Sequence, residues 1–171
     1  TIWKKFSHGL GPVNGDFGKI SLSLLGLNLI FKAMSSDKYV LQEVVDARTE
    51  REFLDLPRKI YKGNRNWVCP LDPSIQAVFD PKKNEMFSDG EAIRWIARDK
   101  KGEVVGRIAA FYDREHAFLE EQPTGGCGFF EAINDQELAD QLFDAARMWL
   151  SSRGMEAMDC LLYTSPSPRD A

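Results

Sequence analysis

The sequence predicts a mixed α/β domain, and three observations carry this prediction. A run rich in β-branched residues, Tyr39 to Val45, has the composition of a strand. Two further apolar runs, Ala92 to Arg98 and Val104 to Phe111, are separated by a short polar segment typical of a β-hairpin. The segment from Asp135 to Ser152 repeats apolar residues at helical spacing.

Helical signals follow the first strand. Thr49 and Glu52 have the spacing of a capping box, in which Thr49 would be the N-cap. Apolar residues continue from there to Pro57, and a helix interior disfavours proline because proline has no backbone N–H. We therefore expect one short helix that ends near Pro57 and a second one from Arg58 to Tyr61.

The next segment combines a loop with a helix start. Residues 62–71 carry turn-forming residues and one large aromatic side chain, Trp67. Asp72-Pro73-Ser74 then resembles an N-terminal cap followed by proline at the first helical position. The sequence thus predicts a helix near Ile75 to Phe79.

The second half of the chain predicts a meander followed by a long helix. The hairpin turn is Asp99 to Gly102, and a further strand fits Gly128 to Ile133. The helix from Asp135 to Ser152 should end at Gly154, since glycine is the usual residue after a helix. A new strand begins at Met155 and extends to Asp159.

Composition and charge exclude several functional classes. The chain has 171 residues, of which 43% are hydrophobic and 28% charged, enough for one globular domain. The net charge is −4, so we expect neither a nucleic-acid nor a membrane partner. The longest apolar stretch, Ile20 to Phe31, is interrupted by polar residues and is too short to cross a membrane.

The cysteines do not suggest a metal site or a disulfide framework. Cys69, Cys127 and Cys160 are odd in number and lack Cys-x-x-Cys spacing, and His8 and His116 lie far from them in sequence. We expect reduced thiols, no bound metal and a cytoplasmic location.

Both ends of the chain differ in character from its middle. Met34 immediately precedes the first strand signal, so residues 1–33 are expected to be a non-native or disordered extension. Residues 160–171, which end in Ser-Pro-Ser-Pro-Arg-Asp-Ala, resemble a translated sequencing adapter. The alternative for this tail is a proline-rich segment that binds a partner. The domain itself would then span residues 34–159.

Five local signatures stand out in the sequence, and they are Phe53–Tyr61, Asn66–Leu71, Val105–Ile108, Gly128–Glu131 and Trp149–Gly154. Together they resemble a bacterial GNAT-like family of undefined substrate, within the superfamily of acyl-CoA N-acyltransferases. The resemblance covers Tyr39 to Asp159 and implies the N-terminal part of a GNAT fold, so the domain would be incomplete in this chain. One departure is Cys69, where the family more often has a second proline.

The resemblance implies an activity and a cofactor. It implies that the parent protein transfers an acyl group from acetyl-CoA or another acyl-CoA to a small-molecule or peptide amine. In the superfamily, the pyrophosphate of CoA binds backbone N–H groups where the helix after the fourth strand begins. The corresponding residues here are Ile133, Asn134, Asp135, Gln136 and Glu137. No catalytic residue and no oligomeric state is indicated, and the chain alone is expected to be inactive.

The proposed pyrophosphate segment departs from the superfamily pattern, which leaves an alternative open. The segment has no glycine, whereas the usual loop uses glycines to let phosphates approach the backbone. Asp135 and Glu137 add two negative charges, and Asn134 and Glu137 have capping-box spacing. The alternative is a non-catalytic GNAT-fold module for binding or interaction. A weaker one is a regulatory protein that recognises a metabolite through the loop around Trp67.

Other candidate residues have simpler structural interpretations. Arg107 could reach an anionic ligand, although a solvated position or an ion pair is the more common role of such a residue. Glu115 and His116 could supply a base because histidine titrates near neutral pH. Four large aromatic residues are expected to pack in the core rather than contact substrate. They are Trp67, Phe129, Phe130 and Trp149.

Overall fold

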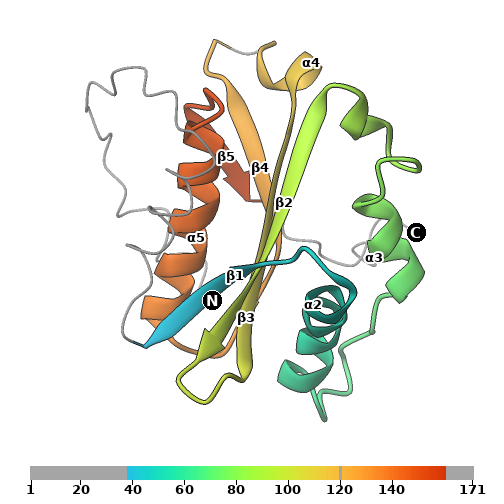
Figure 1. The fold of residues 1–171 in the computed structure, drawn as a ribbon, viewed down its shortest axis with the longest axis vertical. Helices are drawn as coiled ribbons and strands as arrows, with labels where there is room; N and C mark the ends of the chain where they lie inside the picture. The colour runs from blue at the N-terminus through green and yellow to red at the C-terminus, as the bar shows by residue number, and fades with distance from the viewer. Residues whose placement is uncertain (1–37, 120, 161–171) are drawn as a thin grey trace.

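The computed structural model describes residues 38–119 and 121–160, which contain five strands and five helical segments (Figure 1). The expectations for residues 1–33 and 161–171 lie outside the described residues, and Cys160 is the last residue of the final strand. In chain order the elements are β1 (Tyr39–Glu43), α2 (Ala47–Ile60), α3 (Asp72–Val78), the 3₁₀ helix η2 (Glu85–Ser88), β2 (Gly90–Asp99), β3 (Val104–Asp113), α4 (Arg114–Ala117), β4 (Thr124–Ala132), α5 (Gln136–Ser151) and β5 (Ala157–Cys160).

The strands form one mixed sheet in the order β1-β2-β3-β4-β5. The first four strands are antiparallel, while β5 pairs parallel to β4 after the crossover through α5. Helix α5 covers one face of the sheet, and α2 and α3 lie on the other (Figure 1). The predicted mixed α/β architecture is therefore confirmed, and the two faces of the sheet have different roles.

Two apolar clusters correspond to these two faces. The larger cluster packs α5 residues such as Leu142 and Trp149 against Trp95 and Ile108 of the sheet. The smaller cluster lies under α2 and includes Val44, Phe53, Leu56, Ile96 and Val104. Side chains alternate between the faces of a strand, so each central strand supplies residues to both clusters.

Helix α2 begins earlier than the sequence predicts. Its N-cap is Asp46, whose Oδ1 accepts a hydrogen bond from the Thr49 N–H at 2.7 Å. Thr49 Oγ1 in turn accepts from the Asp46 N–H at 3.2 Å, which completes a capping box. The expectation that Thr49 is the N-cap was wrong because Thr49 takes the third helical position instead.

Helix α2 also continues through Pro57, so the expected division into two helices was wrong. Proline removes the N–H that would normally bond to the carbonyl four residues earlier, here that of Phe53. In this structure Arg107 Nη1 donates to the Phe53 carbonyl oxygen at 2.6 Å. A strand side chain thus replaces the missing helical donor, and Pro57 stays inside α2.

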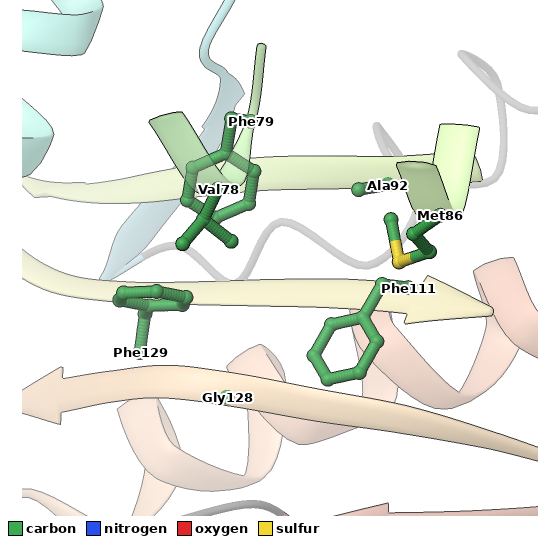
Figure 2. Close-up of a pocket in the computed structure, with 7 residues that line it drawn as sticks. All are labelled: Val78, Phe79, Met86, Ala92, Phe111, Gly128 and Phe129. Atoms are coloured by element: carbon green, nitrogen blue, oxygen red, sulfur yellow. The ribbon is translucent and has the colours of Figure 1, made fainter. Parts of the chain in front are cut away.

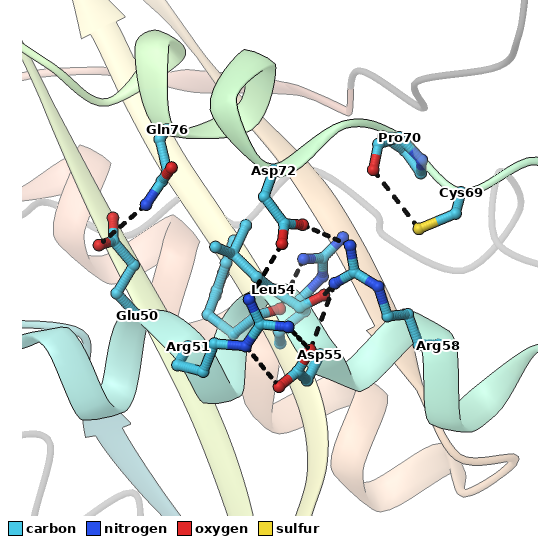
Figure 3. A network of polar contacts seen from close by, with 11 residues as sticks. Glu50, Arg51, Leu54, Asp55, Arg58, Cys69, Pro70, Asp72 and Gln76 are labelled. Carbon is cyan, nitrogen blue, oxygen red and sulfur yellow. Dashed lines mark hydrogen bonds and ion pairs between the residues drawn. The ribbon is translucent and has the colours of Figure 1, made fainter.

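Two side chains of α3 contact α2: Gln76 Nε2 donates a hydrogen bond to Glu50 Oε2 at 3.5 Å, and Asp72 contacts two arginines. Asp72 accepts a hydrogen bond from Arg51 Nη1 at 3.1 Å and forms a second, shorter ion pair with Arg58 (Figure 3). The sequence suggested that Asp72 caps its own helix, but the N-cap is Leu71 and makes no side-chain cap. Asp72 instead fixes the position of α3, which matters because α3 forms one wall of the site described below.

The Asp72 ion pairs predict a pH-dependent contribution to stability. The hydrogen bond from Arg58 lowers the pKa of Asp72 below its ordinary value of 3.8. A lowered folded-state pKa stabilises the protein above the ordinary value, and this contribution is lost as the pH falls through the folded-state pKa. We expect Asp72→Asn to reduce the unfolding free energy by up to about 1 kcal/mol at pH 7, and by less near pH 3, which lies below the ordinary pKa.

Urea unfolding at both pH values measures this effect. Asp144→Asn is a matched control, because Asp144 pairs with Arg147 on the exposed surface of α5. A loss for Asp72→Asn that is the same at both pH values would contradict the ion-pair explanation.

Candidate functional site

Strand β4 contains a bulge near its C-terminal end. Arg107 pairs with Glu131 and Ala109 pairs with Gly128, so two β4 residues, Phe129 and Phe130, lie opposite one residue of β3. Phe129 has φ of 53°, in the left-handed region that costs a bulky residue roughly 1–2 kcal/mol. Phe129 packs against the cluster under α2 and Phe130 against the cluster under α5, so the two side chains of the bulge lie on opposite faces of the sheet.

An apolar cavity lies at the bulge, between α3, η2 and the sheet (Figure 2). Figure 2 shows Val78, Phe79 and Phe129 toward one end of the view and Met86 and Phe111 toward the other. The cavity has a volume of about 130 Å³. We call it the α3 cavity, and it is lined by Val78, Phe79, Met86, Ala92, Phe111, Gly128 and Phe129.

Aromatic rings support one wall of the α3 cavity from behind. The ring centroids of Phe79 and Phe129 are 5.1 Å apart, and Phe53 of α2 lies 6.1 Å and 6.2 Å from them. The Arg94 guanidinium lies over the Phe79 ring at 4.5 Å. These contacts fix the rings from several directions, so this wall is preorganised.

A buried ion pair lies beside the bulge. Arg107 is 2% exposed, and its Nε donates to Glu131 Oε2 at 2.6 Å. Burial raises the pKa of the nearby Tyr61 phenol, and the charge of Glu131 adds to this shift. The expected ion pair of Arg107 is therefore confirmed. The Arg107 guanidinium is buried and already donates to Glu131 and to the Phe53 carbonyl, so it does not fit the role of binding an anionic ligand.

The predicted pyrophosphate segment, Ile133 to Glu137, connects β4 to α5. Ile133 and Asn134 are exposed, and Asp135 rather than Asn134 is the N-cap, with Oδ1 accepting from the Leu138 N–H at 3.2 Å. The expected capping box between Asn134 and Glu137 was therefore wrong, because the N-cap is Asp135 and it forms a single side-chain cap. An ion pair joins Lys38 to Asp135, and Lys38 Nζ lies 3.9 Å from Glu137 Oε2.

The N-cap assignment gives a direct prediction. Asp135→Ala should lower the melting temperature measurably because it removes the acceptor of the Leu138 N–H. Asn134→Ala should change the melting temperature much less, although it removes a side chain of similar size one residue away. Thermal unfolding of the two variants by circular dichroism measures the difference. Equal effects would contradict Asp135 as the N-cap.

The remaining candidate residues lie outside the α3 cavity. His116 is exposed on α4, and its Nδ1 is 2.8 Å from Asp113 Oδ2. That contact raises the pKa of His116 and so favours the protonated ring. Trp149 is buried as predicted. Trp67, expected in the core, is half-buried and stacks on Tyr61 at 5.2 Å.

Phe129 and Phe130 both pack against the apolar clusters, and Phe129 also has a place in the candidate site. Both are half-buried and pack against the apolar clusters, Phe130 stacking on Phe143 of α5 at 4.5 Å. Phe129 also lines the α3 cavity. The expectation of core packing therefore describes Phe130 better than Phe129.

Residues 38–119 and 121–160 contain neither a metal-binding cluster nor a membrane-spanning helix. No cluster of three or more histidine, cysteine, aspartate or glutamate residues in this part could hold a metal ion. Helices of sufficient length and hydropathy to cross a membrane are not found there either. Cys69, Cys127 and Cys160 are free thiols.

Two bacterial proteins are similar to this chain in sequence, although no family model matches it. Protein YghO of Escherichia coli strain K12 is 32% identical over 108 residues, which are 61% of this chain and 26% of that protein. The bacterial ceramide synthase of Caulobacter vibrioides is 32% identical over 129 residues, which are 72% of this chain and 32% of that protein. The chain spans at most about a third of the length of these relatives.

Solved structures of low sequence identity share the fold. A tandem GNAT protein from the clavulanic acid biosynthesis pathway superposes with a TM-score of 0.55 at 15% identity, covering 76% of this chain and 38% of that one. A predicted acetyltransferase with acetyl-CoA from Clostridium acetobutylicum gives 0.52 at 13% identity, covering 75% and 82%. At such identities the similarity shows the fold alone, and it confirms the fold implied by the sequence resemblance.

Proposed function

We propose, for a chain that has the GNAT acyltransferase fold, that the protein containing it transfers an acyl group from acyl-CoA to the amine of a long-chain amino alcohol. The observation that carries this proposal is the bulge of β4, which adjoins the α3 cavity and precedes the start of α5. Transfer requires the donor carbonyl and the acceptor nitrogen to meet in a fixed geometry, and a bulge in a rigid sheet can supply such a position.

The sequence relatives support the choice of acceptor. One relative is named a bacterial ceramide synthase. A ceramide is an amide between a fatty acid and a long-chain amino alcohol, so its synthesis is an N-acylation. This chemistry is the transfer to an amine implied by the GNAT resemblance. We further propose that the protein acts in the cytoplasm of a bacterium.

The start of α5 offers partial support for binding the donor. A helix N-terminus favours anions, but the Asp135 and Glu137 carboxylates oppose a pyrophosphate there. Lys38 offsets part of this charge through its contacts with both carboxylates. We propose that the donor pyrophosphate binds at residues Ile133 to Glu137 and that Lys38 contributes a positive charge to it.

A second function is favoured by the same residues. The Asp135 carboxylate already occupies the Leu138 N–H, which is one of the donors that a pyrophosphate would use. If this arrangement excludes CoA, the fold serves as a binding or interaction module without catalysis. The two functions differ in whether CoA binds at all.

Calorimetric titration of CoA into the complete gene product that contains this chain distinguishes the acyltransferase from the non-catalytic module. The variant pairs Asp135→Asn with Glu137→Gln, because asparagine is as good an N-cap as aspartate and both changes remove only charge. We expect CoA to bind the wild type and to bind the double variant roughly tenfold more tightly, since like charges near the helix start oppose the anion. Asp140→Asn, further along α5, is the matched control.

Transfer is measured as release of the CoA thiol from acyl-CoA when a long-chain amino alcohol is added. Release that depends on the amine supports the acyltransferase. CoA binding without release would favour the non-catalytic module, and neither binding nor release in any variant would contradict CoA-dependent transfer.

A further inference from the structure

We propose that the α3 cavity binds the alkyl chain of a fatty acyl group, so that the donor carries a long-chain acyl group rather than an acetyl group. This inference rests on the proposed acyl transfer and deepens it by naming the donor class. It follows from the chemistry of the cavity wall, from the volume of the cavity and from its position on β4.

The wall of the α3 cavity contains only apolar groups. Its seven lining residues carry aliphatic, thioether or aromatic side chains, or no side chain in the case of Gly128. A hydroxyl or ammonium group placed there would lose its hydrogen bonds to water without replacement. The cavity therefore suits a hydrocarbon and is unsuited to the polar end of an amino alcohol.

The volume suits several methylene groups. The α3 cavity measures about 130 Å³, close to the roughly 150 Å³ of an engineered apolar cavity that stays dry and binds benzene. About six carbon atoms of an extended chain therefore fit. An acetyl group would fill only a small part of this space.

The position of the α3 cavity connects it to the donor. Gly128 and Phe129 of the cavity wall lie on β4, the strand that leads directly to the proposed donor segment at Ile133. At the usual rise of a strand, Gly128 and Ile133 are about 17 Å apart along the chain. A donor with its phosphates at the start of α5 and its arm along β4 would bring its acyl group to the bulge and the cavity.

The cavity walls are fixed rather than ready to collapse. Phe79 contacts the rings of Phe53 and Phe129 and lies under the Arg94 guanidinium. Helix α3, which ends at Val78, is tied to α2 through Asp72. A simple packing defect would need no such support, and ligand binding distinguishes the two cases.

The test compares probes of different chain length on the complete gene product. The probes are decanoyl-CoA, acetyl-CoA, free decanoate and decylamine, and affinities are measured by calorimetry. Each buried methylene contributes about fourfold to affinity. We expect decanoyl-CoA to bind at least about tenfold more tightly than acetyl-CoA, and we expect decanoate to bind more tightly than decylamine.

Three variants test whether the preference for decanoyl-CoA over acetyl-CoA arises in the α3 cavity. Ala92→Leu adds three carbon atoms to the cavity wall and should remove most of the decanoyl preference. Ala47→Leu makes the same change at the exposed first residue of α2 and should leave the preference intact. Met86→Ala enlarges the cavity and should change the affinity for decanoyl-CoA while leaving the affinity for acetyl-CoA unchanged, which keeps the test informative if Ala92→Leu fails to fold.

The outcomes distinguish this inference from the proposed function. Equal binding of acetyl-CoA and decanoyl-CoA, unchanged in Ala92→Leu and Met86→Ala, would overturn the alkyl site and leave CoA-dependent transfer standing. Tighter binding of decylamine than of decanoate, lost in Ala92→Leu, would assign the cavity to the acceptor and overturn the donor assignment. Binding of decanoate that Ala92→Leu abolishes, without binding of any CoA compound, would support the alkyl site and overturn CoA-dependent transfer.

Discussion

Replacing Arg107 by methionine is expected to reduce the unfolding free energy by about 3–5 kcal/mol, the usual cost of removing one member of a buried ion pair. The change leaves the Glu131 carboxylate without its buried partner and the Phe53 carbonyl without its donor. Methionine has a similar length and fills the same space, so the loss reports the polar contacts rather than a cavity. Chemical denaturation of wild type and variant measures the difference.

A second substitution tests the link between Arg107 and the proline of α2. Pro57→Ala restores the N–H that can donate to the Phe53 carbonyl within the helix. The double variant should therefore lose less stability than the sum of the single changes, with a coupling of about 1 kcal/mol. Strict additivity would show that Arg107 does not substitute for the missing helical donor.

Phe53→Ala is expected to cost about 3–5 kcal/mol, the range for removing a buried aromatic ring. Phe53 is 0% exposed, and its ring contacts Phe79 and Phe129 as well as the Arg107 guanidinium, 4.6 Å from the ring centroid. The change should also loosen the wall of the α3 cavity, because Phe79 and Phe129 lose the ring behind them.

Two control substitutions test whether the loss of stability in Phe53→Ala comes from the buried ring cluster. Phe53→Leu keeps much of the apolar volume and should cost clearly less than Phe53→Ala. Phe118→Ala removes the same ring from a position that is 53% exposed and should change stability by no more than about 0.5 kcal/mol. If Phe118→Ala cost as much as Phe53→Ala, the ring cluster would not be the source of the effect.

The sequence predicted the elements whose signals are local. Hairpin β2–β3 and helix α5 follow from a turn sequence and from helical periodicity, and both lie where they were expected. The continuous helix α2 could not be predicted in this way. Its tolerance of Pro57 depends on Arg107, a residue fifty positions later that meets it only in the folded protein.

The candidate site was predicted only in part. The sequence located the start of α5 but assigned its N-cap to Asn134, since Asn134 and Asp135 are both good N-cap residues and backbone geometry decides between them. The α3 cavity was missed because α3, η2 and three strands together form it. No local signal marks the bulge, because Phe129 and Phe130 face opposite sides of the sheet, as consecutive residues of a strand do.

The order of strands in the sheet equals their order in the chain, and this has a consequence for how the protein folds. Strands β2, β3 and β4 pair across short connections, whereas β1 must close a loop that contains α2 and α3, and β5 requires the crossover through α5. Closing a longer loop costs more entropy before any contact compensates for it. In pulse-labelled refolding, amides of the β2–β3 hairpin should therefore become protected from exchange before those of β1.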